Sequence, residues 1–521
     1  MAQTSLPTGL FFFSDARTCK SWLREIPLTN IAQAQQSILD ALRMLNRTPS
    51  FVPLDRLTCM ELLRDKVAYL LGEQRSRYAS KTIPLSTGDY AAWNISRQLV
   101  MEMEAGYRIC WAQANGADAP LQSYCALLIQ RTMRYIGLQM LIAGLVYRQF
   151  DPALWTRLHL LWSEAESRNL TTKRVKDSVG TADTYSSITQ AYTAVLLGQL
   201  ARTTELTPRQ IDFVDAVLKR FGHKVVVTRE AVANPQGMIC TVDLLFSEGC
   251  HYTASLEPSD AIRVLDLQGV SQSLRRRIKK LAAGEEPGSL DLPPDWGREE
   301  AEAQLIRLHR LWCEGKEARP VATQPEETEA ILSFGIAETH FFLYGDFFEQ
   351  PGVKRELTRQ EMNDIAIFGK VAESTIRARY ADFNYGTETW GVVDEVRGQF
   401  RLLRPGNSAR GVAIGKLLGV KIGRQGAFYL GVIREIQDDP EGTIVITVEL
   451  LPGKPEAVAV RAADSAARTN ANYVQGFRLP PNEALKTPEA LIVPPGLAAK
   501  DRAIDIYHPT HGVPKKVMTA G

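Results

Sequence analysis

The chain has 521 residues, of which 61 are lysine or arginine and 59 are aspartate or glutamate, so its formal net charge is only +2. Such a balance gives no overall attraction to nucleic acid or to an acidic membrane, and any basic recognition site must be local. The length exceeds what one ordinary hydrophobic core holds, so we expect about two to four domains.

The cysteines and the apolar segments indicate a reduced protein that does not cross a membrane. The seven cysteines are widely scattered and never spaced as Cys-x-x-Cys, which favours free thiols over a disulfide framework or a zinc site. The N-terminus lacks a basic segment followed by a long apolar core, so no secretory signal is expected. The longest apolar stretch, residues 136–146, is shorter than the ~18 residues that span a bilayer. We therefore expect a cytoplasmic protein without a membrane span.

Residues 1–222 have a helical pattern. The apolar residues Ile31, Ile38, Leu42 and Leu45 fall on one helical face, which needs a partner surface. The stop signal Thr48-Pro49 follows them. Further segments with helical patterns are 57–71, 90–111, 121–150, 153–168, 185–201 and 208–221. This part is predicted to be an all-α bundle or repeat-like module, and it either binds a protein partner or is a plain globular α domain.

A mixed region, residues 223–315, follows the helices. Strand-like runs flank a turn at Asn234-Pro235, and two helices are predicted at 273–283 and 299–313. The region is either mixed α/β or a second, degenerate barrel. Residues 316–328 are rich in charge, proline and threonine and are expected to form a linker, and residues 329–373 form a mixed connecting segment.

Short runs of β-forming residues, punctuated by Gly, Pro and Asp, characterise residues 374–463. Runs this short and regular predict a small antiparallel barrel and argue against a parallel sheet. Residues 464–521 form a proline-rich C-terminal extension. The chain is therefore predicted to be multidomain α + β, with an N-terminal helical module, a mixed α/β middle region and a C-terminal small antiparallel β-barrel.

The sequence carries no recognisable catalytic or metal-binding motif. The glycine-rich segment 406–411 contains a serine but is not Gly-x-Ser-x-Gly, and residues 411–416 lack the Gly-Lys-Ser/Thr ending of a phosphate-binding loop. His508 and His511 flank a proline and have no third ligand nearby. We therefore expect neither an enzyme nor a metal site.

One local basic cluster stands out. It consists of Arg275, Arg276, Arg277, Lys279 and Lys280. On a helix these cations cover more than one face, so they bind phosphates, an acidic partner or only water. Aromatic residues that would stack on single-stranded bases are not interleaved with them, so we do not expect nucleic acid as a partner.

The strand-like segment Trp390-Gly391-Val392-Val393-Asp394 and several others resemble one known family. The segments 415–420, 429–434 and 448–453 are similar to the closing strands of PilZ domains, small bacterial β-barrels known as cyclic di-GMP receptors. The helical segments 22–28 and 39–46 are similar to the front half of larger proteobacterial PilZ-domain proteins. The resemblance implies a PilZ-like barrel with cyclic di-GMP as its ligand and no other cofactor.

The resemblance also implies which residues would bind the ligand. A cyclic dinucleotide presents two phosphates and stacked guanines, which need guanidinium forks and a close-approaching glycine turn. The family pattern has an Arg-rich arm, then Asp/Asn-x-Ser-x-x-Gly. Here Val396 stands where the serine belongs, and the glycine comes one residue early. The implied residues are Arg377, Arg379, Asp394, Arg397, Gly398, Arg401 and Arg404.

These departures from the family pattern leave three interpretations open. The barrel binds the cyclic dinucleotide in an atypical way, or it has lost the ligand and binds protein, or the resemblance is one of architecture alone. The leading hypothesis is a cytosolic bacterial regulatory protein that senses cyclic di-GMP and relays the signal to a protein partner through its helical module. The alternative is a non-enzymatic interaction scaffold whose barrel no longer binds nucleotide.

Overall fold

The computed structural model divides the chain into two compact units. The N-terminal unit comprises Met1–Arg319 with Asp438–Pro440, and the C-terminal unit comprises Pro320–Gln437 with Glu441–Gly521. The residues that the structure describes are 12–114, 119–177, 179, 185–257, 259–315, 328–352, 357–372, 374–375, 385–396, 398–439, 441–463, 472–497, 502–508 and 514–518. Within these segments, helices dominate the first unit and strands the second, so the predicted multidomain α + β class is confirmed.

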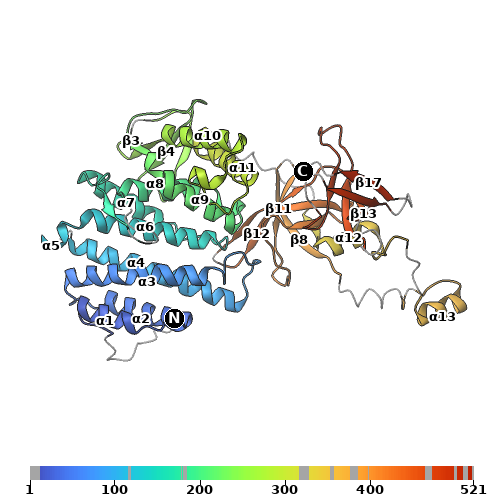
Figure 1. The fold of residues 1–521 in the computed structure, drawn as a ribbon, viewed down its shortest axis with the longest axis horizontal. Coiled ribbons are helices and arrows are strands. Elements are labelled where there is room, and N and C mark those ends of the chain that lie inside the picture. The colour runs from blue at the N-terminus through green and yellow to red at the C-terminus, as the bar shows by residue number, and fades with distance from the viewer. Residues whose placement is uncertain are drawn as a thin grey trace. The chain divides into compact units, whose positions relative to one another are not determined.

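The N-terminal unit is built on a stack of helices (Figure 1). The helices are α1 (Ala16–Glu25), α2 (Ile31–Arg47), α3 (Pro53–Arg75), α4 (Thr87–Ala114), α5 (Ala119–Gln122), α6 (Cys125–Gly144), α7 (Ala153–Ser167), α8 (Ile188–Leu200) and α9 (Pro208–Phe221). Two short strands, β1 (Val175–Lys176) and β2 (Tyr185–Ser186), pair between α7 and α8. Long helix α4 packs against α2, α3 and α6, and α6 packs in turn against α7 and α8.

Local sequence signals explain where these helices begin and what they bury. Asn30 caps α2 by accepting a hydrogen bond from the Gln33 backbone, and Thr207 forms a capping box at the start of α9. Of the predicted stripe of α2, Ile38, Leu42 and Leu45 are fully buried, and Ile31 is half-buried. No helix in the described segments is long and apolar enough to cross a membrane.

A small sheet follows the helical stack in the N-terminal unit. Its strands are β3 (Val226–Thr228), β4 (Ile239–Asp243), β5 (His251–Thr253) and β6 (Ile262–Asp266), in the order β3-β6-β4-β5. After β6 the chain continues as helices α10 (Gln268–Ala282) and α11 (Arg298–His309), which pack against each other. No pairing between β3 and β5 is seen in the described residues, so these strands form an open sheet there and not a second barrel.

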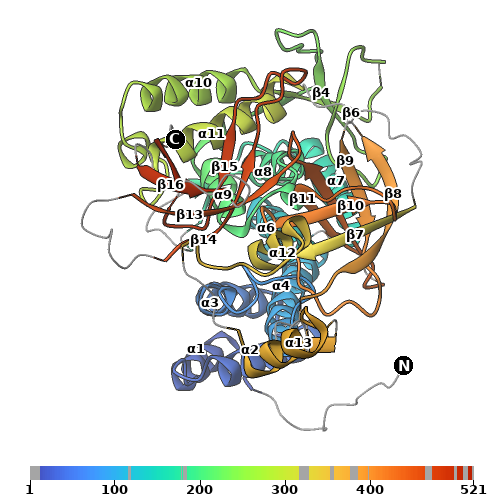
Figure 2. The ribbon, with the colours of Figure 1, turned by 90° about the vertical axis from the view of Figure 1, so that its right-hand side faces the viewer.

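The C-terminal unit contains a closed barrel (Figure 2). Its six strands in the described residues are β7 (Glu329–Phe334), β8 (Glu388–Val396), β9 (Gln399–Leu403), β10 (Leu417–Ile422), β11 (Tyr429–Asp438) and β12 (Ile444–Leu450). The order β10-β11-β12-β9-β8-β7 closes because β7 pairs antiparallel with β10. The barrel thus starts at Glu329, well before the predicted residue 374, because its first strand is separated from the rest by two helices.

A second sheet occupies the end of the chain, in the range that the sequence indicated as a proline-rich extension. Its strands are β13 (Glu456–Ala462), β14 (Val474–Leu479), β15 (Ala490–Ile492), β16 (Ala503–Tyr507) and β17 (Pro514–Met518), in the order β15-β14-β13-β16-β17. Strand β13, which lies inside the predicted barrel range 374–463, belongs to this sheet. The prolines lie mostly in the connections, where they end strands without removing a hydrogen bond from the ladder.

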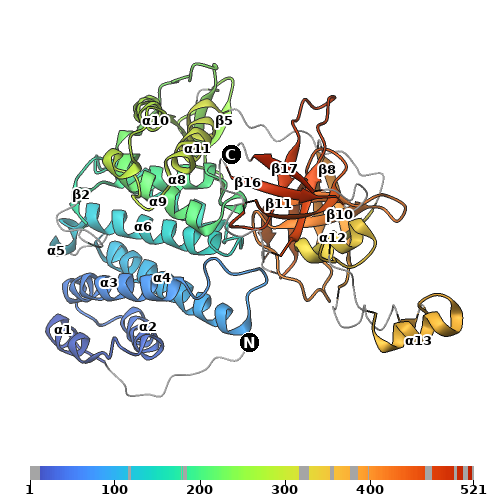
Figure 3. The ribbon, with the colours of Figure 1, turned by 45° about the vertical axis from the view of Figure 1, so that its right-hand side comes forward.

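Helix α12 (Ile336–Tyr344) joins the barrel to the second sheet (Figure 3). It packs against β7 and β10 of the barrel and against β13 and β14 of the sheet. Leu430 of the barrel and Phe477 of the sheet belong to one buried cluster, to which Leu343 of α12 adds. A further helix, α13 (Arg359–Phe368), begins at a capping box that Thr358 forms with Glu361.

Candidate ligand site on the barrel

The hairpin of β8 and β9 carries most of the described residues that the sequence implied for ligand binding. Val396 of β8 pairs with Gln399 of β9, and Gly398, just before Gln399, has a φ of +79°. A left-handed conformation at this place favours glycine, because it has no Cβ to clash. The glycine that comes one residue early in the family pattern is therefore explained by a tight hairpin turn.

A β-bulge decides which way Asp394 faces. Val392 pairs with Leu402, but the next pair is Asp394 with Arg401, so one residue of β8 is left without a partner on β9. Leu402 is fully buried in the barrel, and Arg401 beside it on the same strand points outward. The extra residue therefore turns Asp394 from the inner to the outer face. There its carboxylate accepts a hydrogen bond from Arg401 at 2.7 Å.

This ion pair leaves hydrogen-bonding capacity unused. Asp394 Oδ1 and Arg401 Nε are buried without a hydrogen-bond partner among the described residues. Arg401 uses one of its five donors on Asp394. The other donors of this guanidinium are the ones that would bind a phosphate or a guanine edge. The pair is only partly exposed, which strengthens contacts made there compared with contacts in open solvent.

Arg404, at the end of β9, has a different role. Its Nη2 donates to the backbone carbonyl of Ser408 and, at 3.4 Å, to that of Arg410. The Ser408 hydroxyl donates in turn to Glu388 of β8 at 2.7 Å. Arg404 therefore holds the loop between β9 and β10 against the barrel.

The structure shows a second charged group that the sequence analysis did not single out. Arg410 pairs with Glu338 of α12 at 2.6 Å, and Lys416 donates to the Gly411 carbonyl at 2.8 Å. Both cations approach the ring of Phe334, at 5.9 and 5.6 Å from its centre. Burial and the nearby Arg410 lower the pKa of Lys416, although Glu338 raises it. Nothing in the sequence pairs Arg410 with a glutamate 72 residues earlier, so only the fold reveals this contact.

The remaining arginines implied by the resemblance are Arg377, Arg379 and Arg397, which lie outside the described residues.

The basic cluster lies in the N-terminal unit, on α10, and several of its cations have structural contacts. Arg277 stacks on Phe221 at 3.9 Å from the ring centre. Arg275 donates to His309 of α11 at 3.0 Å, and Lys280 pairs with a glutamate in the following turn at 2.9 Å. Contacts of this kind hold α10 against its neighbours and are not typical of a phosphate-binding surface.

The comparisons with known proteins concern the N-terminal unit. Residues 17–231 match the N-terminal domain of the cyclic-di-GMP receptor FimW. The FimW match runs from α1 to β3, so it includes the whole helical stack and ends before the barrel. No curated protein and no solved structure matches the chain. In the described part of the chain, no group of three or more His, Cys, Asp or Glu side chains could hold a metal ion.

Proposed function

We propose that the chain is a bacterial, cytoplasmic regulatory protein that binds cyclic di-GMP. The observation that carries the proposal is the match of residues 17–231 to the N-terminal domain of the cyclic-di-GMP receptor FimW. The closed six-stranded antiparallel barrel in the described part of the C-terminal unit supports it, because a barrel of this kind is what the PilZ resemblance implies. On this proposal the protein works by binding and conformational signalling, without catalysis.

The ligand site would lie on the outer face of the β8–β9 hairpin. Arg401 would bind a phosphate or the guanine edge with the donors that Asp394 leaves unused, and Gly398 lets the backbone come close to a base. Arg377, Arg379 and Arg397 would supply the further guanidinium groups that two phosphates require. The helical unit would then pass the signal to a protein partner, as its stacked helices offer a broad surface.

Calorimetric titration with cyclic di-GMP tests the receptor proposal. We expect saturable heat with the wild-type protein and an affinity about tenfold or more lower for Arg401→Gln, since a charge-assisted hydrogen bond is lost. Arg424→Gln is the matched control, because Arg424 is an exposed barrel arginine that pairs only with Glu329, at 3.2 Å, among the contacts in the structure. Double replacement of Arg377 and Arg379 by glutamine should weaken binding further.

Each outcome of that titration has a separate meaning. Absence of heat with the wild-type protein would refute the receptor proposal. Binding that Arg401→Gln and the Arg377/Arg379 double variant leave unchanged would keep the receptor but refute the hairpin as its site.

A protein-only scaffold is the second candidate. It is favoured by one observation, that Asp394 pairs with Arg401 at 2.7 Å and offsets the charge of this arginine. This candidate predicts that partner capture is the same with and without cyclic di-GMP and that deletion of residues 1–222 abolishes it. Recovery of the same partners by the isolated C-terminal unit would count against it.

A further inference from the structure

A pocket of about 310 Å³ opens in the N-terminal unit between the start of α7, the end of α8 and the loop that joins β4 to β5. The residues that line it include Phe150, Trp155, Gln199, Ser247, Glu248 and His251. Its volume is near the lower end of the ~300–1,000 Å³ that is usual for ligand pockets, so it fits one side chain or a small group. The match to the FimW domain ends at residue 231 and does not include the loop that completes this pocket.

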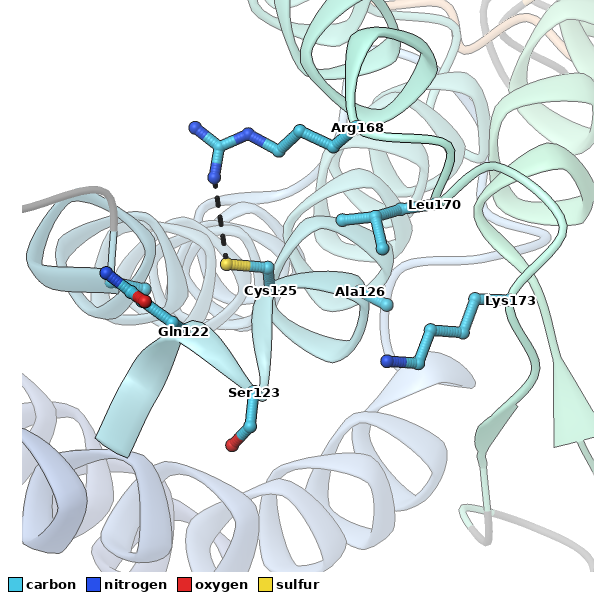
Figure 4. A pocket seen from close by; sticks show the side chains of 8 residues that line it. Gln122, Ser123, Cys125, Ala126, Arg168, Leu170 and Lys173 are labelled. Carbon is cyan, nitrogen blue, oxygen red and sulfur yellow. Dashed lines mark hydrogen bonds between the residues drawn. The ribbon is translucent and has the colours of Figure 1, made fainter. Parts of the chain in front are cut away.

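A larger pocket of the same unit, of about 400 Å³, has its charge already bound by the protein. It lies between the start of α6 and the loop that follows α7 (Figure 4). Its Arg168 donates to Glu164 at 3.2 Å and contacts the Cys125 thiol at 3.9 Å. The interactions of this arginine are therefore made within the protein itself.

The smaller pocket combines aromatic rings with a carboxylate. Phe150 and Trp155 contribute the rings, which meet edge to face with their centres 6.0 Å apart. The β4–β5 loop contributes the carboxylate of Glu248, which is exposed, and α8 contributes the amide of Gln199. No lysine or arginine is among the described residues that line this pocket. Such a lining suits an organic cation, because aromatic rings and a carboxylate both attract it.

Hydrogen bonds fix the loop that carries Glu248. The ring of His159, on α7, donates from Nε2 to the Glu248 carbonyl at 2.8 Å. The hydroxyl groups of Thr156 and Ser247 share a hydrogen bond of 2.7 Å, which ties the loop to the same helix. On the other side, the Cys250 thiol donates to a backbone carbonyl of α8 at 3.5 Å. This fixed geometry reduces the entropy that binding costs.

Three exposed apolar side chains lie beside the pocket and form what we call the apolar rim: Leu160, Leu245 and Phe246. Leu245 and Phe246, which directly precede Ser247 in the loop, are 81% and 62% exposed. Leu160 is 62% exposed and lies one turn after Thr156, on the face of α7 that contacts the loop. A small organic cation in the pocket would leave the rim in water, whereas a protein segment would cover it.

We propose that this pocket binds an arginine side chain of a protein partner, in a segment where apolar residues flank that arginine. The guanidinium lies against the rings of Phe150 and Trp155 and donates to the Glu248 carboxylate, and the flanking residues pack on the apolar rim. Arginine fits better than lysine, because its planar guanidinium can stack on a ring and bind a carboxylate with two donors. The inference rests on the proposed partner-binding role of the N-terminal unit and states the chemistry of that partner.

Calorimetric titration of the full-length protein with a short blocked peptide, in which one arginine stands between two leucines, tests the proposal. We expect saturable binding, and an affinity about tenfold or more lower for Glu248→Gln or for a peptide with glutamine in place of the arginine. Glu230→Gln is the matched control, because Glu230 is an exposed glutamate of the same unit that does not line the pocket. Leu245→Ser should weaken binding of the peptide and leave the weaker binding of acetylarginine amide unchanged.

A second readout uses the histidine in the pocket wall. Bound peptide should slow the modification of His251 by diethyl pyrocarbonate, measured by mass spectrometry, and should leave the exposed His223 unaffected. Lack of saturable binding, an equal loss of affinity in Glu230→Gln, or equal protection of both histidines would overturn the proposal. If acetylarginine amide binds as tightly as the peptide, the protein partner is refuted and the pocket is a site for a small organic cation. These titrations contain no cyclic di-GMP, so their failure can be told apart from failure of the receptor proposal.

Discussion

Replacement of Asp177 by asparagine should destabilise the helical unit strongly. Its carboxylate pairs with Arg64, with Arg134 at 3.3 Å and with Arg131 at 3.9 Å. The side chains of Arg64 and Arg131 are only 6% and 2% exposed, so the change leaves buried guanidinium groups without their shared counterion. Removing one partner of a buried pair costs about 3–5 kcal/mol. Glu61 also pairs with Arg131, at 3.0 Å, and compensates in part. We therefore expect the free energy of unfolding to decrease by about 3 kcal/mol.

Urea unfolding followed by far-ultraviolet circular dichroism measures this loss, because helices dominate the signal. Asp215→Asn is the control, since it makes the same chemical change in an exposed pair with Lys219 and should cost about 0.5 kcal/mol. Burial raises the pKa of Asp177, but Arg134, Arg64 and Arg131 outweigh it and hold the pKa below its usual range. The stabilisation is therefore present above the unfolded pKa of about 4 and is lost as the pH falls through the lower folded value. If Asp177→Asn lowers the free energy of unfolding by less than about 1 kcal/mol at neutral pH, the argument from the buried ion pairs is wrong.

Two further predictions concern the C-terminal unit. Burial lowers the pKa of His340 to about 4, so the unfolded chain binds a proton that the folded chain rejects between about pH 4 and 6.5. As the pH is lowered from about 6.5 to 4, the free energy of unfolding should decrease by roughly 3 kcal/mol. His340→Phe should remove much of this decrease. If acid lowers the melting temperature of the wild type and of His340→Phe equally, this prediction is wrong. Gly419→Ala should cost about 1–3 kcal/mol, because the new Cβ would lie 2.8 Å from Thr339 Cγ2 and still closer to Ser333 Oγ. Gly391→Ala, whose Cβ meets its nearest atom at 3.7 Å, should melt close to the wild type, and equal melting shifts would refute the packing argument.

The helices could be predicted well from the sequence because their signals are local. Ile38, Leu42 and Leu45 of the predicted stripe are buried, and α9 and α13 begin at capping boxes that Thr207 and Thr358 form with residues only three positions later. The β-rich half was harder, since strand pairing depends on residues far apart in the chain. Strand β7 pairs with β8 across two intervening helices, and no pattern near Glu329 indicates that partner.

The candidate site shows the same division between local and long-range information. The sequence placed Asp394, Gly398 and Arg401 in one set, and the structure brings them onto one hairpin. The bulge that turns Asp394 outward depends on the register with β9, which short-range patterns do not determine. Arg404 looked equivalent to Arg401 in the sequence, yet its position past the end of β9 directs it to the Ser408 carbonyl.

The shared cluster beneath α12 has a consequence for the size of the folding unit. Leu430 of the barrel packs in the same cluster as Phe477 and Leu479 of the second sheet, and Leu343 of α12 lies against it. A truncation after residue 463 would strip that cover and expose apolar side chains of both α12 and β11 to water. The barrel and the terminal sheet should therefore unfold in one cooperative transition, and a fragment cut at the barrel's edge should aggregate. A fragment that retains the hairpin should therefore also include α12 and the second sheet.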